Sequence, residues 1–285
     1  MTGPSEHSVD KLENPRTAAI SSGTISYLEA GGGQPLVFLH GIGSAARSWY
    51  HQIAAFSNRC RVVAWNAPGY AQSTPPKNAV PTATDYAAAL NELLSVLQID
   101  RCHLVAHSLG TLMAARFAAE FGRERLLSLT LCGATGGQGK FPTEKRKAML
   151  DDRLKDLAQL GVRGMAEKRG PRLLGPHATP DMIREVVEIQ ADAVRPEGYE
   201  RAARMLANAD IFTDLQRFPP SLRVQIAYGE DDAIAPPALN IRIAEACRAP
   251  AHAVARAGHA LYLENPDRVN EVIATFVDAR PDSLP

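Results

Sequence analysis

The sequence predicts an α/β fold in which helices cover both faces of a mostly parallel sheet and a helical cap is inserted. Two observations predict it. Continuous apolar runs, typical of strands buried on both faces, alternate along the chain with longer helical patterns. This alternation stops near residue 135 and resumes near residue 214. We therefore expect a core domain of residues 1–134 and 214–285, and a helical cap of residues 135–213.

The elements before residue 135 follow one another regularly. Residues 18–30 are expected to form two short strands joined at Ser22 and Gly23. Buried strands are then expected over residues 35–40, 60–66, 103–108 and 126–133, and helices over residues 48–57, 84–99 and 109–121. Thr84 would cap the second of these helices.

After the inserted segment, the alternation predicts a strand over residues 223–229, a helix over 237–247 and a last short strand over 251–258. Asn265 would cap a final helix with Pro266 at its first position. The inserted segment itself is rich in Arg, Lys, Glu and Leu and contains no convincing strand. It is expected to form several helices.

The composition disfavours several classes of function. The 285 residues are 45% hydrophobic and 22% charged, and 31 basic residues balance 31 acidic ones. This balance gives no overall field that would attract nucleic acid or an anionic membrane. No apolar run is long enough to span a membrane, and the N-terminus lacks the apolar core of a signal peptide. We expect a cytoplasmic protein with a small-molecule substrate, and a homodimer is compatible with the sequence.

The four cysteines, at positions 60, 102, 132 and 247, form no CxxC pair and show no zinc-ligand spacing. Reduced thiols are the expected state, because two of the cysteines lie within apolar, strand-like runs. The histidines show no metal-ligand spacing either. We expect neither a metal ion nor an organic cofactor.

Ser108 is the strongest candidate for a catalytic nucleophile. It lies in the segment AHSLG, residues 106–110, between a predicted strand and a predicted helix. A nucleophile elbow needs this context, because a serine held in a strained turn requires small residues two positions before and after it. Ala106 and Gly110 fill those positions. The alternative is that Ser108 is an ordinary residue at the start of a helix.

Asp232 and His259 each follow a predicted strand in the second half of the chain. The order Ser108, Asp232, His259 is one in which Ser-His-Asp triads occur, and it differs from the orders in two unrelated protease folds. Parallel strands bring their carboxyl ends to one edge of the sheet, where such residues would meet. A lone Asp or His in a turn is more often structural, but three such residues in this order favour a catalytic triad.

The segment HGIG, residues 40–43, follows the first buried strand of the predicted parallel sheet and would complete the site. The backbone N–H groups of Ile42 and Leu109 would form an oxyanion hole. A competing interpretation is a dinucleotide-binding loop, with the two glycines of HGIG followed by Ala46. That motif needs an acidic residue about 20 positions further on. The next strand ends in Asn66 instead, so the dinucleotide interpretation is disfavoured.

Five segments make the chain resemble the α/β-hydrolase superfamily from about residue 20 to residue 280. They are HGIG (40–43), WNAPGYAQS (65–73), AHSLG (106–110), GEDDAIAP (229–236) and AGHALYLENP (257–266). The family pattern assigns the acid to Asp232 rather than Asp231. Two departures matter, because Ala106 stands where glycine is usual and Thr111 replaces a frequent second glycine.

Among capped members, the chain is most similar to 3-oxoadipate enol-lactonases and related hydrolases of aromatic breakdown. The resemblance implies a serine hydrolase with a helical cap that cleaves a small ester or lactone without a cofactor. The rivals are C–C hydrolases of meta-cleavage products, which commonly carry Trp directly after the catalytic histidine, where this chain has Ala260. Dehalogenases and most epoxide hydrolases of this fold need a carboxylate nucleophile, so Ser108 argues against them. A non-catalytic ligand-binding member of the fold is a further alternative.

Substrates of this kind are anionic, so the cap is expected to supply a cation for a substrate carboxylate. Arg169 and Arg172 are the candidates, because Gly170 and Pro171 interrupt the helical pattern between them and could turn a side chain inward. The alternative is that both arginines are surface charges. Trp49 is expected to contribute to the pocket wall or to the core.

Overall fold

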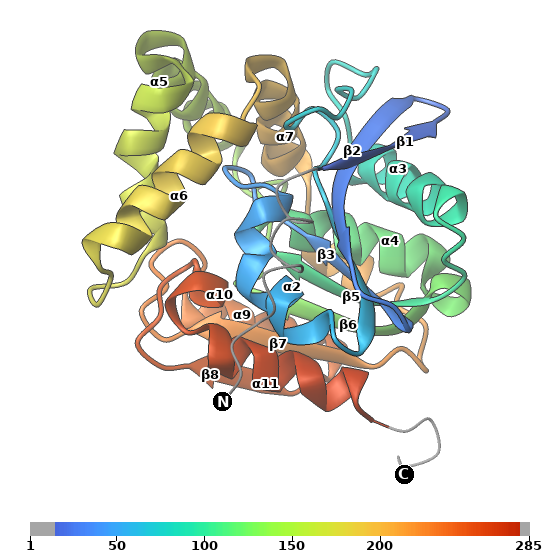
Figure 1. The fold of residues 1–285 in the computed structure, drawn as a ribbon. Coiled ribbons are helices and arrows are strands. Elements are labelled where there is room, and N and C mark those ends of the chain that lie inside the picture. The colour runs from blue at the N-terminus through green and yellow to red at the C-terminus, as the bar shows by residue number, and fades with distance from the viewer. Residues whose placement is uncertain (1–14, 280–285) are drawn as a thin grey trace.

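The structure is a computed structural model, which describes residues 15–279. Within these residues, eight strands form one sheet through the middle of the molecule (Figure 1). They are β1 (Arg16–Ile20), β2 (Gly23–Ala30), β3 (Gln34–Leu39), β4 (Cys60–Trp65), β5 (Cys102–His107), β6 (Leu126–Cys132), β7 (Val224–Gly229) and β8 (Ala251–Val254). Their order in space is β1-β2-β4-β3-β5-β6-β7-β8, and the pairs β1–β2 and β2–β4 are antiparallel. The predicted mostly parallel sheet is confirmed.

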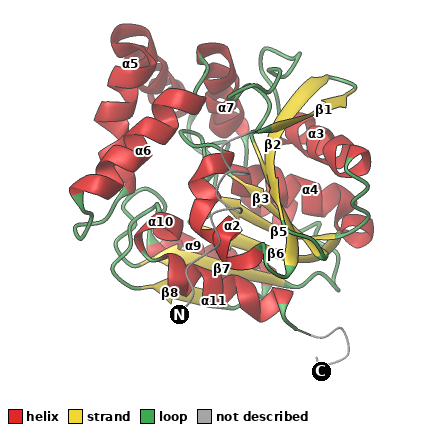
Figure 2. Cartoon of the chain, in the orientation of Figure 1, coloured by secondary structure: helices red, strands yellow, loops and turns green. Residues whose placement is uncertain are grey.

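Helices cover both faces of this sheet (Figure 2). One face carries η1 (Ala46–Trp49), α2 (Tyr50–Phe56), α10 (Leu261–Glu264) and α11 (Pro266–Val277). The other face carries α3 (Ala83–Val96), α4 (Leu109–Arg125), α8 (Ile211–Leu215) and α9 (Pro237–Cys247). The helices on both faces confirm the predicted layers, and α10 is a short helix that the sequence did not predict.

The alternating side chains of the strands explain why both faces are covered. In β3, Leu36 and Phe38 belong to the core beneath α2 and α11, whereas Val37 and Leu39 belong to the core beneath α3 and α4. Successive side chains of a strand point to opposite faces, so a strand covered on both faces is apolar throughout. The continuous apolar runs of the sequence predicted these strands correctly for this reason.

One predicted helix cap is wrong by two residues. Thr82, not Thr84, precedes α3, and the Thr82 N–H donates to the carboxylate of Asp85 over 2.7 Å. A capping box needs an acceptor three positions after the cap, and Asp85 provides it for Thr82. The predicted cap at Asn265 is confirmed, since its side chain accepts the Arg268 N–H over 3.3 Å.

The inserted segment, residues 135–213, lies between β6 and β7. Its helices are α5 (Thr143–Arg169), η2 (Gly170–Leu173), α6 (Pro180–Ala193), α7 (Pro196–Asn208) and the start of α8. In Figure 1, α5, α6 and α7 lie together at the top of the molecule, beyond the sheet. α5 is kinked at Gly161, where φ is 66°. α8 crosses residue 213 and packs against α4 and α9.

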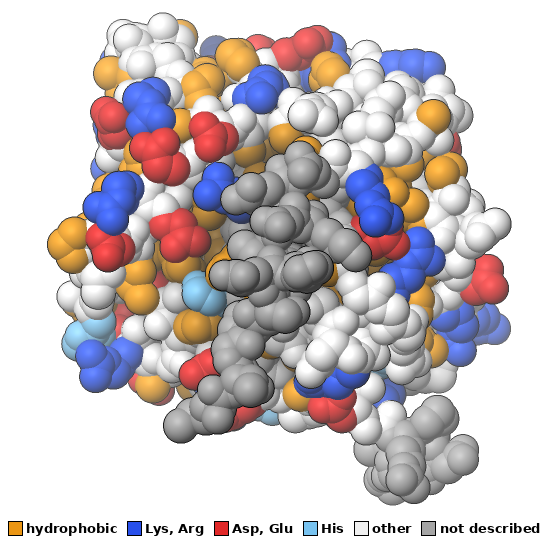
Figure 3. Space-filling model, in the orientation of Figure 1, with side chains coloured by type: hydrophobic (Ala, Val, Ile, Leu, Met, Phe, Trp, Pro, Cys, Tyr) orange, Lys and Arg blue, Asp and Glu red, His pale blue; other side chains and the backbone are white. Residues whose placement is uncertain are grey.

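No helix within residues 15–279 is long and apolar enough to cross a membrane. The prediction about a signal peptide concerns the N-terminal residues, most of which lie outside the described range. Figure 3 shows basic and acidic side chains interspersed over the face that it draws, in agreement with the balanced composition.

Candidate active site

The turn between β5 and α4 places Ser108 at the carboxyl edge of the sheet. Its backbone has φ 51° and ψ −118°, a conformation that a residue with a side chain rarely adopts. The turn also brings α4 close to β3, since a Cβ on Gly110 would lie 2.8 Å from the carbonyl oxygens of both Leu39 and His40. This is the geometry predicted for a nucleophile elbow.

The two departures from the family pattern are accommodated locally. Ala106 is fully buried in β5. Thr111 stabilises the strained turn, because its Oγ1 donates to the Ser108 carbonyl over 2.5 Å and its N–H donates to the same oxygen over 2.9 Å. A glycine at position 111 could make only the second of these bonds.

Three side chains from three strand ends form a continuous hydrogen-bonded series. The Ser108 hydroxyl donates to His259 Nε2 over 2.8 Å, and His259 Nδ1–H donates to Asp232 Oδ2 over 2.8 Å. Ser108 is 8% exposed, His259 2% and Asp232 3%. The three residues predicted as a triad therefore meet, and the buried carboxylate fixes the ring orientation and tautomer that a general base would need.

The loop after β7 fixes the position of Asp232. Its second carboxylate oxygen, Oδ1, accepts the backbone N–H groups of Ile234 and Ala235, both over 2.8 Å. Asp231 is exposed, although it is adjacent in sequence. The geometry thus brings Asp232, rather than Asp231, to the histidine.

The loop after β3 is held by His40 and Tyr70. His40 Nδ1–H donates to the Gly41 carbonyl over 2.8 Å, and its Nε2 accepts the Ala67 N–H over 2.9 Å. Burial lowers the pKa of His40 to about 4, so the ring is neutral at pH 7 and can donate and accept at once. The Tyr70 hydroxyl donates to the Ile42 carbonyl over 2.5 Å. The peptide groups around Ile42 are therefore fixed in orientation.

Ile42 and Leu109, predicted to supply the oxyanion hole, both line a cavity together with Ser108. Leu109 is the first residue of α4, so its N–H belongs to the end of the helix that has no intrahelical acceptors. A Cβ on Gly41 would lie 3.1 Å from Ser108 Cβ, which shows how closely the two loops approach. The backbone of both loops thus borders the serine, where an oxyanion would form.

His107 holds the backbone of His259. Its Nε2–H donates to the His259 carbonyl over 2.8 Å, and the two ring centroids are 4.7 Å apart. Burial first, and then the neighbouring His259 ring, lower the pKa of His107 well below its usual value. A neutral His107 can therefore keep this bond without placing a positive charge beside the His259 ring.

The cavity that Ser108 and His259 line has a volume of about 540 Å³, which suits a small organic substrate. One wall comes from the loops that follow β3, β5, β7 and β8, which we call the strand-end loops. The other wall comes from the inserted segment. The apolar lining residues are Ile42, Leu109, Phe141, Met149, Leu173, Leu206, Phe212, Ile234 and Leu239. The basic lining residues are Lys140, Arg153, Arg169, Arg172 and Arg242, and within residues 15–279 the one acidic lining residue is Asp210.

The two arginines predicted to bind a carboxylate have different surroundings. The Arg169 guanidinium lies 2.5 Å from Asp156 Oδ2 and 2.9 Å from Asp152 Oδ2. Its charge is therefore already compensated, and the buried Asp156 depends on that pairing. Arg172 also lines the cavity, but it is exposed and has no carboxylate within 4 Å among residues 15–279.

Arg153 is a cavity cation that the sequence did not single out. It is half-buried, and its guanidinium donates to the Tyr199 hydroxyl over 3.3 Å. No carboxylate lies within 4 Å of it in the described part of the chain. α5 carries many charged residues, so only the packing of α5 on α7 shows which of them faces the cavity.

Trp49 was a candidate for the substrate-binding pocket wall or for the core, and it does not line the cavity. It is fully buried, with its ring 4.8 Å from Phe38 and 5.0 Å from Tyr262. η1 turns the indole onto the same sheet face as Phe38, and Tyr262 lines the cavity instead. Trp49 is thus a core residue.

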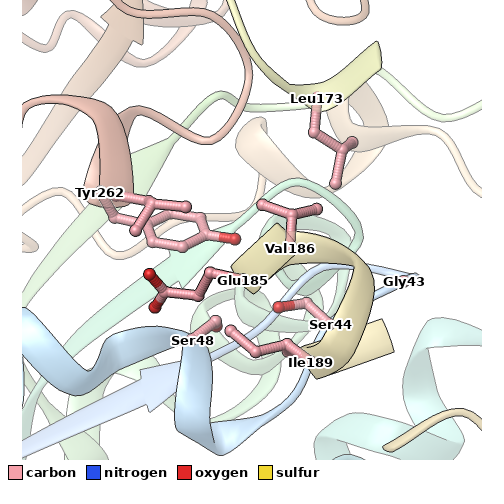
Figure 4. A pocket seen from close by; sticks show the side chains of 9 residues that line it. Gly43, Ser44, Ser48, Leu173, Glu185, Val186, Ile189 and Tyr262 are labelled. Atoms are coloured by element: carbon pink, nitrogen blue, oxygen red, sulfur yellow. The ribbon is translucent and has the colours of Figure 1, made fainter. Parts of the chain in front are cut away.

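A second, much smaller cavity of about 10 Å³ lies between α6 and the loop after β3 (Figure 4). Figure 4 shows Ser44, Ser48, Glu185 and Tyr262 around it, and they come from the loop after β3, η1, α6 and α10 respectively. Its size is about that of one water molecule, and hydroxyl and carboxylate groups offer such a water hydrogen-bond partners. Ser44, Leu173 and Tyr262 line both cavities, so the two are adjacent.

Within residues 15–279, no group of three or more His, Cys, Asp or Glu side chains is arranged to hold a metal ion. The four cysteines are free thiols, three of them buried.

The comparison with known families agrees with this geometry. Residues 36–272 match the alpha/beta hydrolase family, and the matched range spans both parts of the core and the inserted segment. The chain belongs to the alpha/beta hydrolase family. The resemblance inferred from the five sequence segments is thereby confirmed.

Two sequence relatives and one solved structure illustrate what this alpha/beta hydrolase is similar to. The chain is 27% identical over 279 residues to (E)-2-((N-methylformamido)methylene)succinate hydrolase of Acinetobacter baylyi, covering 95% of this chain and 98% of that protein. It is 28% identical over 268 residues to 2-hydroxy-6-oxononadienedioate/2-hydroxy-6-oxononatrienedioate hydrolase of Paraburkholderia phymatum, covering 89% and 90%. Among solved structures, an enol-lactonase of Burkholderia xenovorans superposes with a TM-score of 0.81 at 20% identity, covering 93% of this chain and 100% of that chain. This last similarity concerns the fold alone.

Proposed function

We propose that this alpha/beta hydrolase cleaves a small carboxylic ester or lactone through an acyl-enzyme intermediate. The observation that carries the proposal is the hydrogen-bonded series of Asp232, His259 and Ser108 at the wall of a cavity. Each member has the hydrogen bond that its role in a triad needs, and each is buried.

In the first half-reaction, Ser108 Oγ attacks the substrate carbonyl while His259 Nε2 takes the hydroxyl proton. Asp232 accepts from Nδ1–H and stabilises the imidazolium that forms. The negative charge that develops on the carbonyl oxygen is stabilised by the N–H groups of Ile42 and Leu109. The C–O bond then breaks, and the leaving oxygen takes the proton from His259.

In the second half-reaction, a water molecule gives a proton to His259 as its oxygen attacks the acyl carbon. The resulting tetrahedral intermediate expels Ser108 Oγ, which recovers the proton, and the carboxylic acid is released. A lactone gives a single product, because its leaving oxygen remains attached to the acyl group. These steps use only residues of this chain and water.

We further propose that the substrate carries a carboxylate and that the inserted segment acts as a cap over it. By their names, the relatives from Acinetobacter baylyi and Paraburkholderia phymatum act on a succinate and on a nonadienedioate or nonatrienedioate, which are dicarboxylates. Among the described residues that line the cavity, five are Lys or Arg and one is acidic. Within the inserted segment, Arg153 and Arg172 support the proposal most directly, since neither has a carboxylate partner within 4 Å among the described residues.

A second candidate function is hydrolysis of a C–C bond in a ring-cleavage product. The name of the Paraburkholderia phymatum relative favours it. The residue directly after His259 is Ala260, which is fully buried, whereas the C–C hydrolases commonly carry tryptophan there. Ester or lactone hydrolysis is therefore the stronger proposal.

Hydrolysis of p-nitrophenyl acetate, followed by release of p-nitrophenolate, tests the proposal. The wild-type protein should turn over the ester, and a folded Ser108→Ala variant should not. An enol-lactone, an aryl ester and a 2-hydroxy-6-oxo ring-cleavage product, compared by kcat/KM, then rank the two candidate reactions. If none is hydrolysed and Ser108 takes no fluorophosphonate label, the chain is a non-catalytic, ligand-binding member of its fold.

A further inference from the structure

Glu264, the last residue of α10, joins two loops through one carboxylate. Its Oε1 accepts the Gly175 N–H over 2.7 Å, and its Oε2 accepts the Gly258 N–H over 2.8 Å. Gly175 lies in the inserted segment, two residues after η2 ends, whereas Gly258 directly precedes His259. The carboxylate therefore connects the inserted segment to the loop that carries the proposed general base.

The two loops are also in direct contact. The Ala260 N–H donates to the Leu173 carbonyl over 2.8 Å. A Cβ on Gly258 would lie 2.4 Å from the Gly175 nitrogen, and a Cβ on Gly175 would lie 3.0 Å from the Gly258 nitrogen. No side chain fits between these backbones, so a displacement of one loop must displace the other.

A carboxylate suits this position because it accepts hydrogen bonds on both oxygens and donates none when ionised. Burial raises the pKa of Glu264, its two N–H bonds oppose that rise, and the carboxylates of Asp231 and Asp232 add to it. A third acidic group beside two others is electrostatically unfavourable. The two backbone bonds are the gain that offsets this cost.

We propose that Glu264 is a positioning residue. It fixes the position of His259 relative to the part of the cavity wall that Arg172 and Leu173 form. Glu264 and Gly175 do not line the cavity, so the carboxylate would act without touching substrate. The consequence for catalysis rests on the proposed function, but the link between the two loops does not. Loss of one bond should let both loops shift, and a reacting group displaced by about 1 Å reacts on the order of 10²-fold more slowly.

Glu264→Gln is the sharpest test, because it keeps the shape of the side chain. Its amide oxygen can accept one of the two N–H groups, but its NH2 would face the other. We expect kcat on p-nitrophenyl acetate to fall on the order of 10²-fold, with KM changed less than about threefold. Amide hydrogen exchange at Gly175 and Gly258, measured by NMR, should become faster. Glu245→Gln, on the exposed side of α9, is the matched control and should change neither quantity.

Gly175→Ala tests the same contact from the inserted segment and leaves Glu264 intact. It should lower kcat and speed amide hydrogen exchange at Gly258. If Glu264→Gln does not fold, this variant alone tests whether the two loops are linked. Gly32→Ala, where an added Cβ would meet nothing within 4 Å, is its control.

Wild-type exchange rates in both variants would overturn the proposal, and so would faster exchange with unchanged kcat. If the wild-type protein hydrolyses no substrate, the proposed function fails. The exchange measurement then still decides whether Glu264 links the two loops.

Discussion

The strand-end loops and the inserted segment line the same cavity, but different interactions hold them in place. Ser108, Asp232 and His259 are at most 8% exposed, and they are fixed by bonds to one another and to backbone N–H groups. In α5, by contrast, three of 27 residues are buried. Its ion pairs range from the exposed pair of Arg163 with Glu188 to the pair of Arg169 with the buried Asp156. The three side chains of the proposed triad are thus fixed by backbone geometry, whereas the opposite wall depends on side-chain pairs.

This difference implies that the two regions respond differently to substitution. Exposed ion pairs contribute about 0–1 kcal/mol each, so many of them can be exchanged at little cost to stability. Close backbone contacts, such as those at Gly110 and Gly258, tolerate no added atom without strain. We therefore expect substitutions in the inserted segment to change substrate preference while the proposed chemistry of the strand-end loops is kept.

The largest effect is expected at Ser108. Ser108→Ala removes the attacking hydroxyl and should lower kcat on p-nitrophenyl acetate by about 10⁴–10⁶-fold. The protein should stay folded, since one small polar group is lost, and thermal unfolding checks this. Activity near the wild-type level would show that the strand-end loops do not carry the chemistry.

The next largest effect is expected at Asp232. Asp232→Asn should lower kcat by about 10⁴-fold, because an amide favours the wrong tautomer of His259. Asp231→Asn is the matched control, and its exposed carboxylate should matter little in the same assay. A larger loss at Asp231 than at Asp232 would show that the acid is wrongly assigned.

In the inserted segment, the expected effects are smaller and depend on the substrate. Arg153→Met or Arg172→Met should lower kcat/KM on an anionic ester roughly 30–160-fold. This corresponds to a loss of about 2–3 kcal/mol of transition-state stabilisation. The neutral methyl ester of the same compound should be unaffected. Arg169→Met should instead lower the melting temperature, because it leaves Asp156 with one partner fewer.

Equal losses on the anion and on its methyl ester would indicate damage to packing. No loss at Arg153 or at Arg172 would contradict the proposed anion site.

The smallest expected effect is a difference in stability cost between a glycine substitution in a strand-end loop and one in the inserted segment. Gly110→Ala should destabilise the fold by about 1–3 kcal/mol, because the added Cβ would lie 2.8 Å from two carbonyl oxygens. Gly136→Ala in the inserted segment should change stability by less than about 0.5 kcal/mol, since its Cβ would meet Leu239 at 3.5 Å. Urea denaturation measures both, and equal costs would remove the contrast between the regions.

The strand-end loops could be predicted from the sequence because their geometry leaves local signatures. A strained turn demands small residues around Ser108, and strands covered on both faces are continuously apolar. In the segment GEDDAIAP after the strand 223–229, it was the resemblance to the family pattern that assigned the acid to Asp232 rather than to Asp231. These signatures depend on a few neighbouring residues, so no knowledge of the packing was needed.

The inserted segment and the supporting residues leave no such signature. Arg153 differs from the other charges of α5 only in its packing beside Tyr199. Glu264 lies in a segment that the sequence did identify, but one of its bonds joins it to Gly175, 89 positions away. Trp49 turns toward Phe38 because of the direction of η1, which the sequence did not specify.

Covalent labelling of the wild-type protein tests the central claim most directly. After incubation with a fluorophosphonate, digestion and mass spectrometry should find one adduct, on Ser108, because a serine activated by His259 attacks the phosphorus. His259→Gln should slow labelling strongly, and Ser108→Ala should abolish it. Labelling of a different residue, or ester hydrolysis by the wild-type protein that persists after full exposure to the reagent with Ser108 unmodified, would contradict the account.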